Sequence, residues 1–442
     1  MPAHSSFVDS FHDGPSNGPF TMSFHTSSTH HEGSHSFNIK SVDHRLKLPI
    51  GVDELDSSDA GAPAVGPLVE PAIDHAAVAD APLGPLSSFK GTFQGVGFNT
   101  IFRPNSGPGA GTTFPKAVNP PPPTPPNNNV LELNLTAETL TFKQQLGQVP
   151  NRGLGTQGDI VLNGIPYEQT ISDVTNLATG QSDGDPVNIH FENGLWMHVP
   201  ASKSPSLPTS LCRMGSIPHG STINAQSFAP TATVAGPPVI PPTSITPFVV
   251  GQPSKLVMFA STNASDSATA RLPQDLSKFM ATGAITQKTL SDPNSVLRNA
   301  LVGTEITNTT VFTVSTKATA PMQGGGTANI AFLDPNANVP QMSATFWIET
   351  VQHELVVPVW HPRQPDLRLA VPAPNSSAPA GPTFTVRPPF AITAPKKVTV
   401  TSTQIQYSQM VFLNFGGLTW PHVSVATLVP RDDQIVPESV FF

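Results

Sequence analysis

The sequence has one cysteine in 442 residues, Cys212, and only 12% of its residues are Asp, Glu, Lys or Arg. A single cysteine excludes an internal disulfide bond and favours a reducing compartment, so we expect a cytoplasmic protein. Scarce Glu and Lys leave little material for solvent-facing helices. The chain instead contains 50 Pro and 33 Gly, and this composition predicts a loop-rich, mainly β fold.

What is missing also argues against several classes of protein. The net charge of −8 and the lack of any run of Lys and Arg argue against nucleic-acid binding. Residues 1–20 lack the cationic and apolar regions of a signal peptide, and no apolar stretch is long enough to predict a membrane span. No phosphate-binding loop, nucleophile elbow or paired-cysteine zinc site occurs. A homo-oligomer is compatible with the sequence.

Composition along the chain predicts a barrel with one insertion. The first segment contains eight of the fourteen histidines and few apolar clusters, so we expect an extended or disordered arm. Its histidines fit either a metal site or a solvated polar tail. The expected parts are the His/Pro-rich arm at 1–85, the first part of a β-barrel at 86–235, an insertion with short helices at 236–308, the remaining barrel strands at 309–430 with a Pro-rich loop at 358–390, and a C-terminal tail at 431–442.

Residues that alternate in period two predict an antiparallel up-and-down barrel. From 90 to 102, glycines lie on one side and bulky residues are interleaved, as a strongly coiled strand at a barrel closure requires. Asn163-Gly164 and Asn193-Gly194 each stand between two alternating runs, which predicts a hairpin turn at both places. A final long hairpin is expected around Gly416-Gly417.

The insertion contains the segments that predict helices. One helix is expected near residues 273–280, where apolar side chains form one stripe. The other is expected to start at Asp292-Pro293 and to stop at Gly303, because an N-cap residue followed by Pro is typical of a helix start. Both helices are short, so we expect them to act as lids or braces.

Four segments follow one another in an order that resembles a known family. Residues 91–97 read G-T-F-Q-G-V-G, residues 140–148 contain L-T-F and G-Q, residues 190–196 read H-F-E-N-G-L-W, and 218–220 read P-H-G. In this order they resemble the motifs of the nitrobindin-type haem-binding β-barrels, relatives of the lipocalins and the fatty-acid-binding proteins, with Phe93 where that family usually has Trp. The resemblance covers roughly residues 88–230. It implies a lipocalin-like barrel with a hydrophobic pocket and haem as a candidate cofactor, with His422 as the candidate axial ligand.

Three side chains are candidates for catalysis. His219 lies in a constrained turn, where it is either exposed at the barrel mouth or bonded to the backbone. His198 shares a strand face with Trp196, and that face either lines the cavity or forms an outer aromatic patch. Glu349 shares a face with His353, so the two are either an acid and a base or a solvated cross-strand pair.

A second set of side chains is expected to contact a ligand. Arg103 and Arg213 are rare charges at strand ends, and each either fixes a ligand carboxylate or faces solvent. The ligand-contacting residues that we expect are Phe93, Asn99, Arg103, Trp196, Arg213, Trp347, Tyr407 and Trp420.

Three functions fit these expectations. The leading hypothesis is the binding of a hydrophobic small molecule, with haem as one candidate, inside the barrel. The second is an enzyme on the same barrel, either a haem peroxidase-like protein or an isomerase or cyclase of an apolar metabolite. The third is a structural protein whose barrel is filled by side chains.

Overall fold

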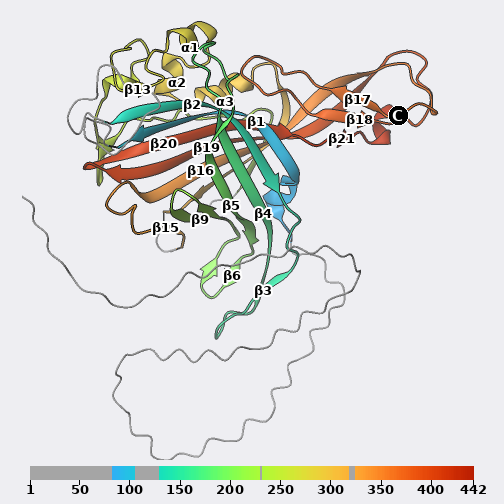
Figure 1. Ribbon diagram of the computed structural model, residues 1–442. Helices are drawn as coiled ribbons and strands as arrows, with labels where there is room; N and C mark the ends of the chain where they lie inside the picture. The colour runs from blue at the N-terminus through green and yellow to red at the C-terminus, as the bar shows by residue number, and fades with distance from the viewer. Residues whose placement is uncertain (1–81, 105–128, 229–230, 318–323) are drawn as a thin grey trace, which may run out of the picture. The chain divides into compact units, whose positions relative to one another are not determined.

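Ten antiparallel strands close into a barrel in the computed structural model, which describes residues 82–104, 129–228, 231–317 and 324–442 (Figure 1). Each barrel strand pairs with the next one along the chain, and the last pairs with the first. The predicted mainly β, antiparallel up-and-down barrel is therefore confirmed. The barrel strands are β1 (Gly91–Arg103), β2 (Val130–Phe142), β4 (Ile160–Asp173), β5 (Val187–Val199), β8 (Ser210–Ile217), β9 (Ser221–Ser227), β14 (Glu305–Ser315), β16 (Asn338–Val357), β19 (Lys396–Phe415) and β20 (Leu418–Pro430).

Shorter elements precede, separate and follow the barrel strands in the sequence. Figure 1 shows the helices of the insertion beside the outer face of β2 and β20, and α3 contacts both β1 and β20. The helices are η1 (Gly84–Ser88), η2 (Ala260–Thr262), α1 (Ser277–Thr282), α2 (Gln287–Ser291), α3 (Ser295–Ala300) and η3 (Glu438–Phe441). The short strands are β3 (Val149–Asn151), β6 (Ser202–Lys203), β7 (Ser206–Leu207), β10 (Ala232–Ala235), β11 (Phe248–Val249), β12 (Gln252–Leu256), β13 (Arg271–Leu272), β15 (Gly326–Asn329), β17 (Leu367–Ala370), β18 (Thr383–Val386) and β21 (Gln434–Ile435).

Both expected helices have counterparts, but their limits differ from the prediction. The first corresponds to α1, and the second to α3, which starts at Ser295 and not at Asp292-Pro293. The carboxylate of Asp292 pairs with Arg298 and accepts a hydrogen bond from the backbone N–H of Thr243. It therefore anchors the loop segment that contains Thr243. The short helix α2 was not expected, although its N-terminus carries a Thr-Thr capping box.

The next two predictions concern the N-terminal arm and a membrane span. The expected arm at 1–85 lies outside the described residues, apart from 82–85. Within the described ranges, no helix is both long and apolar enough to cross a bilayer.

Two glycines let β1 and β20 approach closely where the barrel closes. An added Cβ on Gly95 would stand 1.9 Å from the carbonyl oxygen of Thr427, and one on Gly97 would stand 2.2 Å from that of Val425. Both distances are far below van der Waals contact, so a side chain at either position would force the strands apart. The interleaved glycines expected at a barrel closure thus lie at the seam between β1 and β20.

We expect Gly95→Ala to lower the free energy of unfolding by about 1–3 kcal/mol, because the methyl group would have to displace a backbone carbonyl of β20. Urea denaturation of the full chain measures this loss. Gly158→Ala is the matched control, since an added Cβ there meets no atom within 4 Å. Equal midpoints for the two variants would show that the seam is not held as tightly as the distances indicate.

Both hairpin turns expected at Asn-Gly pairs are wrong, because β4 and β5 each continue through the pair. A two-residue turn of this kind needs a positive φ at both central residues, and neither Gly164 nor Gly194 has one. An added Cβ on these glycines would lie 2.6 Å and 2.0 Å from carbonyl oxygens of the neighbouring strand, so they serve close strand packing. At Gly416-Gly417 the φ values are +57° and +77°, and the hairpin expected there is confirmed.

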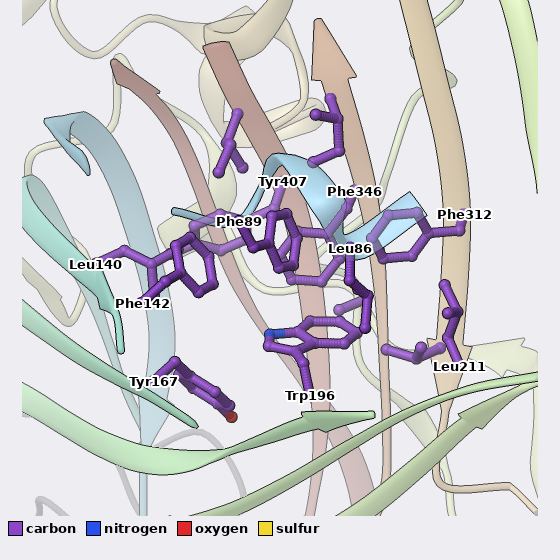
Figure 2. Packing of buried hydrophobic residues seen from close by; sticks show 14 of the residues in the cluster. Leu86, Phe89, Leu140, Phe142, Tyr167, Trp196, Leu211, Phe312, Phe346 and Tyr407 are labelled. Atoms are coloured by element: carbon purple, nitrogen blue, oxygen red, sulfur yellow. The ribbon is translucent and has the colours of Figure 1, made fainter. Parts of the chain in front are cut away.

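Aromatic side chains fill the barrel interior at the end that η1 covers (Figure 2). Leu86 of η1 and the adjacent Phe89 are fully buried, and Phe89 stacks on Phe142 with ring centroids 4.3 Å apart. Trp196 meets Phe346 edge to face at 5.1 Å. Together these contacts close this end of the barrel as a packed core.

Candidate functional site

Three histidines gather at the end of the barrel away from η1, which we call the histidine end. They are His190 at the start of β5, His219 in the turn between β8 and β9, and His422 on β20. The rings of His190 and His219 lie 5.6 Å apart, and both are close enough to His422 to lower its pKa. Three segments distant in sequence thus bring imidazoles together, which is the convergence of polar groups that binding sites use.

His190 lies beside a buried carboxylate. Its Nε2 is 3.5 Å from an oxygen of Glu192, and the imidazole side chain is 14% exposed. Burial is the largest single influence and raises the pKa of Glu192, but the guanidinium of Arg213 together with the contacts to His190 and Tyr167 outweighs it and holds the pKa at about 2. Glu192 is therefore a permanent anion that fixes the orientation of the His190 ring.

A β-bulge connects His190 to His219. In the pairing of β4 with β5, Ile171 lies opposite His190 and Ser172 lies opposite Asn188, so Ile189 is the extra residue. The backbone of Ile189 forms a hydrogen bond with the imidazole of His219, and partial burial together with nearby His190 lowers the pKa of His219. The bulge therefore redirects β5 and holds the turn histidine in place.

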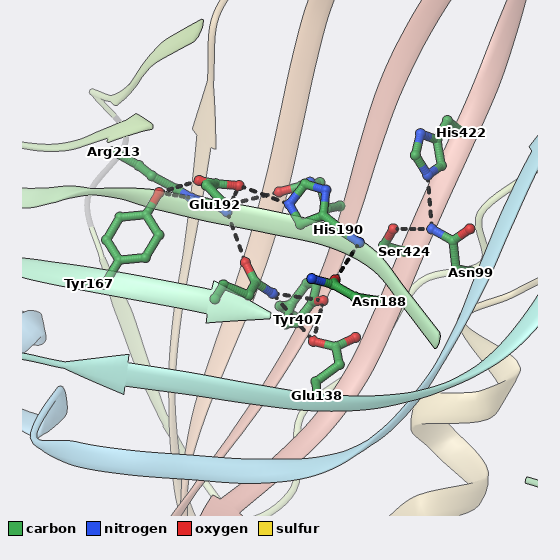
Figure 3. Close-up of polar contacts among 12 residues, drawn as sticks. Asn99, Glu138, Tyr167, Asn188, His190, Glu192, Arg213, Tyr407, His422 and Ser424 are labelled. Atoms are coloured by element: carbon green, nitrogen blue, oxygen red, sulfur yellow. Dashed lines mark hydrogen bonds and ion pairs between the residues drawn. The ribbon is translucent and has the colours of Figure 1, made fainter. Parts of the chain in front are cut away.

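His422 is half-buried and held from one side by Asn99 (Figure 3). The amide Nδ2 of Asn99 donates to Nε2 of His422 at 2.8 Å and to the hydroxyl of Ser424 at 2.8 Å. Burial, with smaller contributions from His190 and His219, lowers the pKa of His422 to about 3. The ring is therefore neutral, and its hydrogen is on Nδ1.

This arrangement does not fit the axial iron ligand that the family resemblance implied. An iron ligand needs a free nitrogen lone pair, but the lone pair of Nε2 is taken by Asn99 and Nδ1 carries the hydrogen. Within the described ranges, no group of three or more His, Cys, Asp or Glu side chains forms a metal site.

Haemin added to the full chain is therefore expected to give no Soret band that depends on His422. The measurement compares the absorbance of the wild type with that of His422→Ala under identical loading. A band present in the wild type and lost in the variant would mean that iron displaces Asn99, and it would restore the haem hypothesis.

A buried polar network fills the middle of the barrel. Arg213 donates to both oxygens of Glu192 at 2.9 and 3.0 Å, to the hydroxyl of Tyr167 at 3.0 Å and to Oε1 of Gln409 at 2.6 Å. Tyr167 in turn donates to Glu192. Gly215 leaves room for this cluster, because an added Cβ there would stand 2.5 Å from Glu192.

A second carboxylate lies next to this network (Figure 3). Tyr407 donates to Glu138 at 2.7 Å, and Gln169 donates to the same oxygen at 3.3 Å while its own Oε1 accepts from Arg213. Burial raises the pKa of Glu138 to about 7, against the lowering effect of these hydrogen bonds. A continuous chain of contacts thus joins Glu138 to His190 through Arg213 and Glu192.

The middle of the barrel has almost no empty space. The cavity between Tyr167, Trp196, Arg213 and Tyr407 has a volume of about 10 Å³, which is about the space that one water molecule needs. A small-molecule ligand therefore has no room at this level of the barrel.

No protein-family model and no curated protein sequence matches the chain. Among solved structures, the crystal structure of Rv2717c from M. tuberculosis is similar at 11% sequence identity and a TM-score of 0.29. The match covers 80% of this chain and 99% of that one. The site therefore has to be interpreted from its own geometry.

The structure divides the predicted ligand-contacting residues between two faces of the barrel wall. Phe93, Trp196, Arg213 and Tyr407 belong to the packed interior, and Asn99 lies at the histidine end. Trp347 and Trp420 instead join the cluster beneath the insertion, where Trp420 stacks on Phe415 with centroids 4.8 Å apart. Arg103 pairs with Glu132 at 3.4 Å at the edge of the barrel.

Two of the three candidate catalytic residues lie away from the histidine end. His198 is at the η1 end, where its imidazole bonds the backbone of Pro82 and would touch a Cβ added to Gly84 at 3.1 Å. Glu349 lies in the wall opposite Gln404, which donates to it at 2.6 Å, while its other oxygen has no partner among the described residues. His353 bonds Ser402 and not Glu349. Only His219 therefore joins the cluster of imidazoles.

Burial raises the pKa of Glu349 to about 8 from its usual 4.5. The folded protein thus keeps a proton that the unfolded chain releases, and this stabilisation, complete below pH 4.5, is lost as the pH rises to about 8. We expect Glu349→Gln to raise the free energy of unfolding near the upper end of this range by on the order of 2 kcal/mol and to leave it nearly unchanged at the lower end. Denaturation at several pH values tests this, with Glu438→Gln on the exposed C-terminal turn as the control.

Sequence reasoning missed most of the residues that build the site. His190 and Glu192 belong to the motif at 190–196 but had no predicted role, and neither Glu138 nor Tyr167 was predicted as a site residue. A usable signal was present, because the alternate residues His190, Glu192 and Trp196 share the inward face of β5. Polar side chains on the buried face of a barrel strand need hydrogen-bond partners inside the barrel, so this pattern indicates a buried polar network.

Proposed function

We propose that this barrel binds a small molecule with an apolar body and a hydrogen-bonding polar group at its histidine end. The observation that carries the proposal is the convergence of His190, His219 and His422, which come from β5, the turn between β8 and β9, and β20. Neutral imidazoles both donate and accept hydrogen bonds, so they suit a polar ligand group without demanding a charge.

Apolar side chains beside the histidines support the apolar part of the ligand. Ile217 and Val411 are only partly buried and pack against the edge of the interior cluster. Val411 pairs directly with His422 across β19 and β20, and Ile217 precedes the turn that carries His219. A ligand between them would contact hydrocarbon on one side and imidazole on the other, as amphipathic ligands require.

A filled, purely structural barrel is the second candidate. The observation in its favour is the cavity of about 10 Å³ in the middle of the barrel. On this interpretation the imidazoles would stabilise the rim of the barrel and bind nothing.

Native mass spectrometry of the full chain purified from cells separates the two candidates. The binding proposal expects a non-covalent adduct of discrete mass on the wild type, reduced in Asn99→Ala and His422→Ala. The control is His361→Ala, which alters a histidine in an exposed turn after β16. A wild type without any adduct, or an adduct equally strong in all variants, would favour the structural barrel.

A further inference from the structure

Glu192 is held in place by several contacts inside the barrel. It is completely buried, accepts two hydrogen bonds from Arg213, and accepts another from Tyr167. Gly194 and Gly215 keep the space around this cluster free, since a Cβ on either would stand within 2.9 Å of the ring or hydroxyl of Tyr167. A carboxylate fixed in this way has one position and one charge state.

This carboxylate sets the tautomer of His190. An ionised carboxylate only accepts hydrogen bonds, so the ring nitrogen facing Glu192 at 3.5 Å, Nε2, carries the hydrogen. The lone pair is then on Nδ1, on the other side of the ring. In the described parts of the chain, no hydrogen-bond partner of Nδ1 is found.

The other two imidazoles lack this combination. The ring of His219 is engaged by the backbone of Ile189, and Nε2 of His422 is engaged by Asn99. His190 alone pairs an orienting carboxylate with a nitrogen available to a bound molecule. Its side chain at the start of β5 keeps an exposure of 14%.

We infer that His190 is a general base, oriented by Glu192, that removes a proton from the molecule bound at the histidine end. This inference rests on the proposed function and adds a reaction to it. The substrate class is a weak carbon or oxygen acid, that is, a small molecule whose X–H bond is acidified by a neighbouring electron-withdrawing group.

The step balances without any further reactant. The X–H bond breaks, its electron pair stays on X, and the proton forms a new bond to Nδ1 of His190. Glu192 remains ionised and stabilises the imidazolium. The proton then returns to another atom of the same molecule, which is an isomerisation, or to water.

The charged and titratable groups around His190 suit this role. Glu192 supplies the negative charge that favours the imidazolium, while Arg213 is already paired with Glu192 and so adds little net repulsion. Neutral His422 keeps an N–H on Nδ1 that can donate to the developing anion on the substrate. Base catalysis by a positioned imidazole typically contributes about 10²–10⁴-fold in rate.

A nitrobenzisoxazole is a suitable probe, because loss of its ring C–H proton to a base breaks the N–O bond and releases a coloured cyano-nitrophenolate. We expect the full-length wild type to accelerate this elimination over buffer. His190→Gln should lower the rate at least about 10-fold, and the control His361→Gln should leave it unchanged. A wild type no faster than buffer, or full activity in His190→Gln, would overturn the inference.

Glu192 is a positioning residue, and its role has a separate readout. Long-range proton–nitrogen NMR of histidine-labelled wild type should show His190 with its hydrogen on Nε2. A hydrogen on Nδ1 would also overturn the inference. Because this measurement uses the wild type, it does not depend on whether a variant such as Glu192→Gln folds. A wild type that carries a mass adduct but does not accelerate the elimination would reject the base and leave the binding proposal standing. A wild type that accelerates the elimination but carries no adduct would reject the binding proposal alone.

Discussion

Replacing Arg213 with Met is expected to lower the free energy of unfolding by about 3–5 kcal/mol, because Glu192 would become a buried carboxylate with no cation beside it. Arg213 is 2% exposed and Glu192 is fully buried, so water cannot substitute for the guanidinium. The loss of stability in Arg213→Met should become smaller as the pH falls, because protonation of Glu192 removes the unpaired charge. The wild type should not become more stable in this way, because the pKa of its Glu192 is held at about 2. Chemical denaturation at several pH values measures both effects.

The double variant Arg213→Met/Glu192→Gln is the matched control. Removing both charges should recover much of the stability, because an apolar or neutral replacement of a buried ion pair is often tolerated while a half-pair is not. Arg213 also lies over the rings of Trp196 and Phe346 at 5.8 and 5.7 Å, and Met retains part of this packing. A double variant no more stable than Arg213→Met would mean that lost packing, and not the unpaired charge, explains the effect.

Replacing Arg271 with Ala is expected to unfold the loop around η2 and to lower the free energy of unfolding by several kcal/mol, on the order of 1–3 kcal/mol for each buried carbonyl left without a partner. The Arg271 side chain is fully buried, and its strand β13 pairs with β2, so the loop is fastened to the barrel at this point. Its guanidinium donates to six backbone carbonyls, those of Ser261, Asn263, Ala264, Asp266, Pro273 and Gln274.

Arg271→Lys is the informative control, because it keeps the charge but has one nitrogen where Arg has three. We expect it to be nearly as destabilising as Arg271→Ala. Hydrogen exchange should show lost protection in residues 260–276 in both variants, while β4 and β5 stay protected. If Arg271→Lys kept the hydrogen-exchange protection of the wild type, the positive charge alone, and not the set of hydrogen bonds to the six carbonyls, would hold the loop.

The alternation of side chains made the fold class predictable. The run from 90 to 102 interleaves glycines with bulky residues, and Met342, Ala344, Phe346 and Ile348 occupy every second position from 342 to 348. Both segments are barrel strands. Proline-rich segments stand between strands, because proline cannot donate to a sheet. Gly416-Gly417 was also readable, since only a turn there needs two residues with positive φ.

The local sequence led to wrong predictions where a glycine allows the neighbouring strand to approach closely. Gly164 and Gly194 resembled turn residues because each follows Asn, yet they lie inside β4 and β5, where a side chain would strike the adjacent backbone. The same limit affected Trp347 and Trp420. Period two shows that alternate residues share a face, but it does not show which face of a barrel is covered by an insertion from elsewhere in the chain.

The sequence by itself determined the fold class, an antiparallel up-and-down barrel, and the absence of the better-known catalytic motifs, because these depend on neighbours along the chain. Only the tertiary structure decided that Glu192 meets Arg213, that Asn99 occupies a nitrogen of His422, and that the middle of the barrel is filled. The physical reason is barrel closure, which places β1 against β20 and brings side chains hundreds of residues apart to within hydrogen-bond distance.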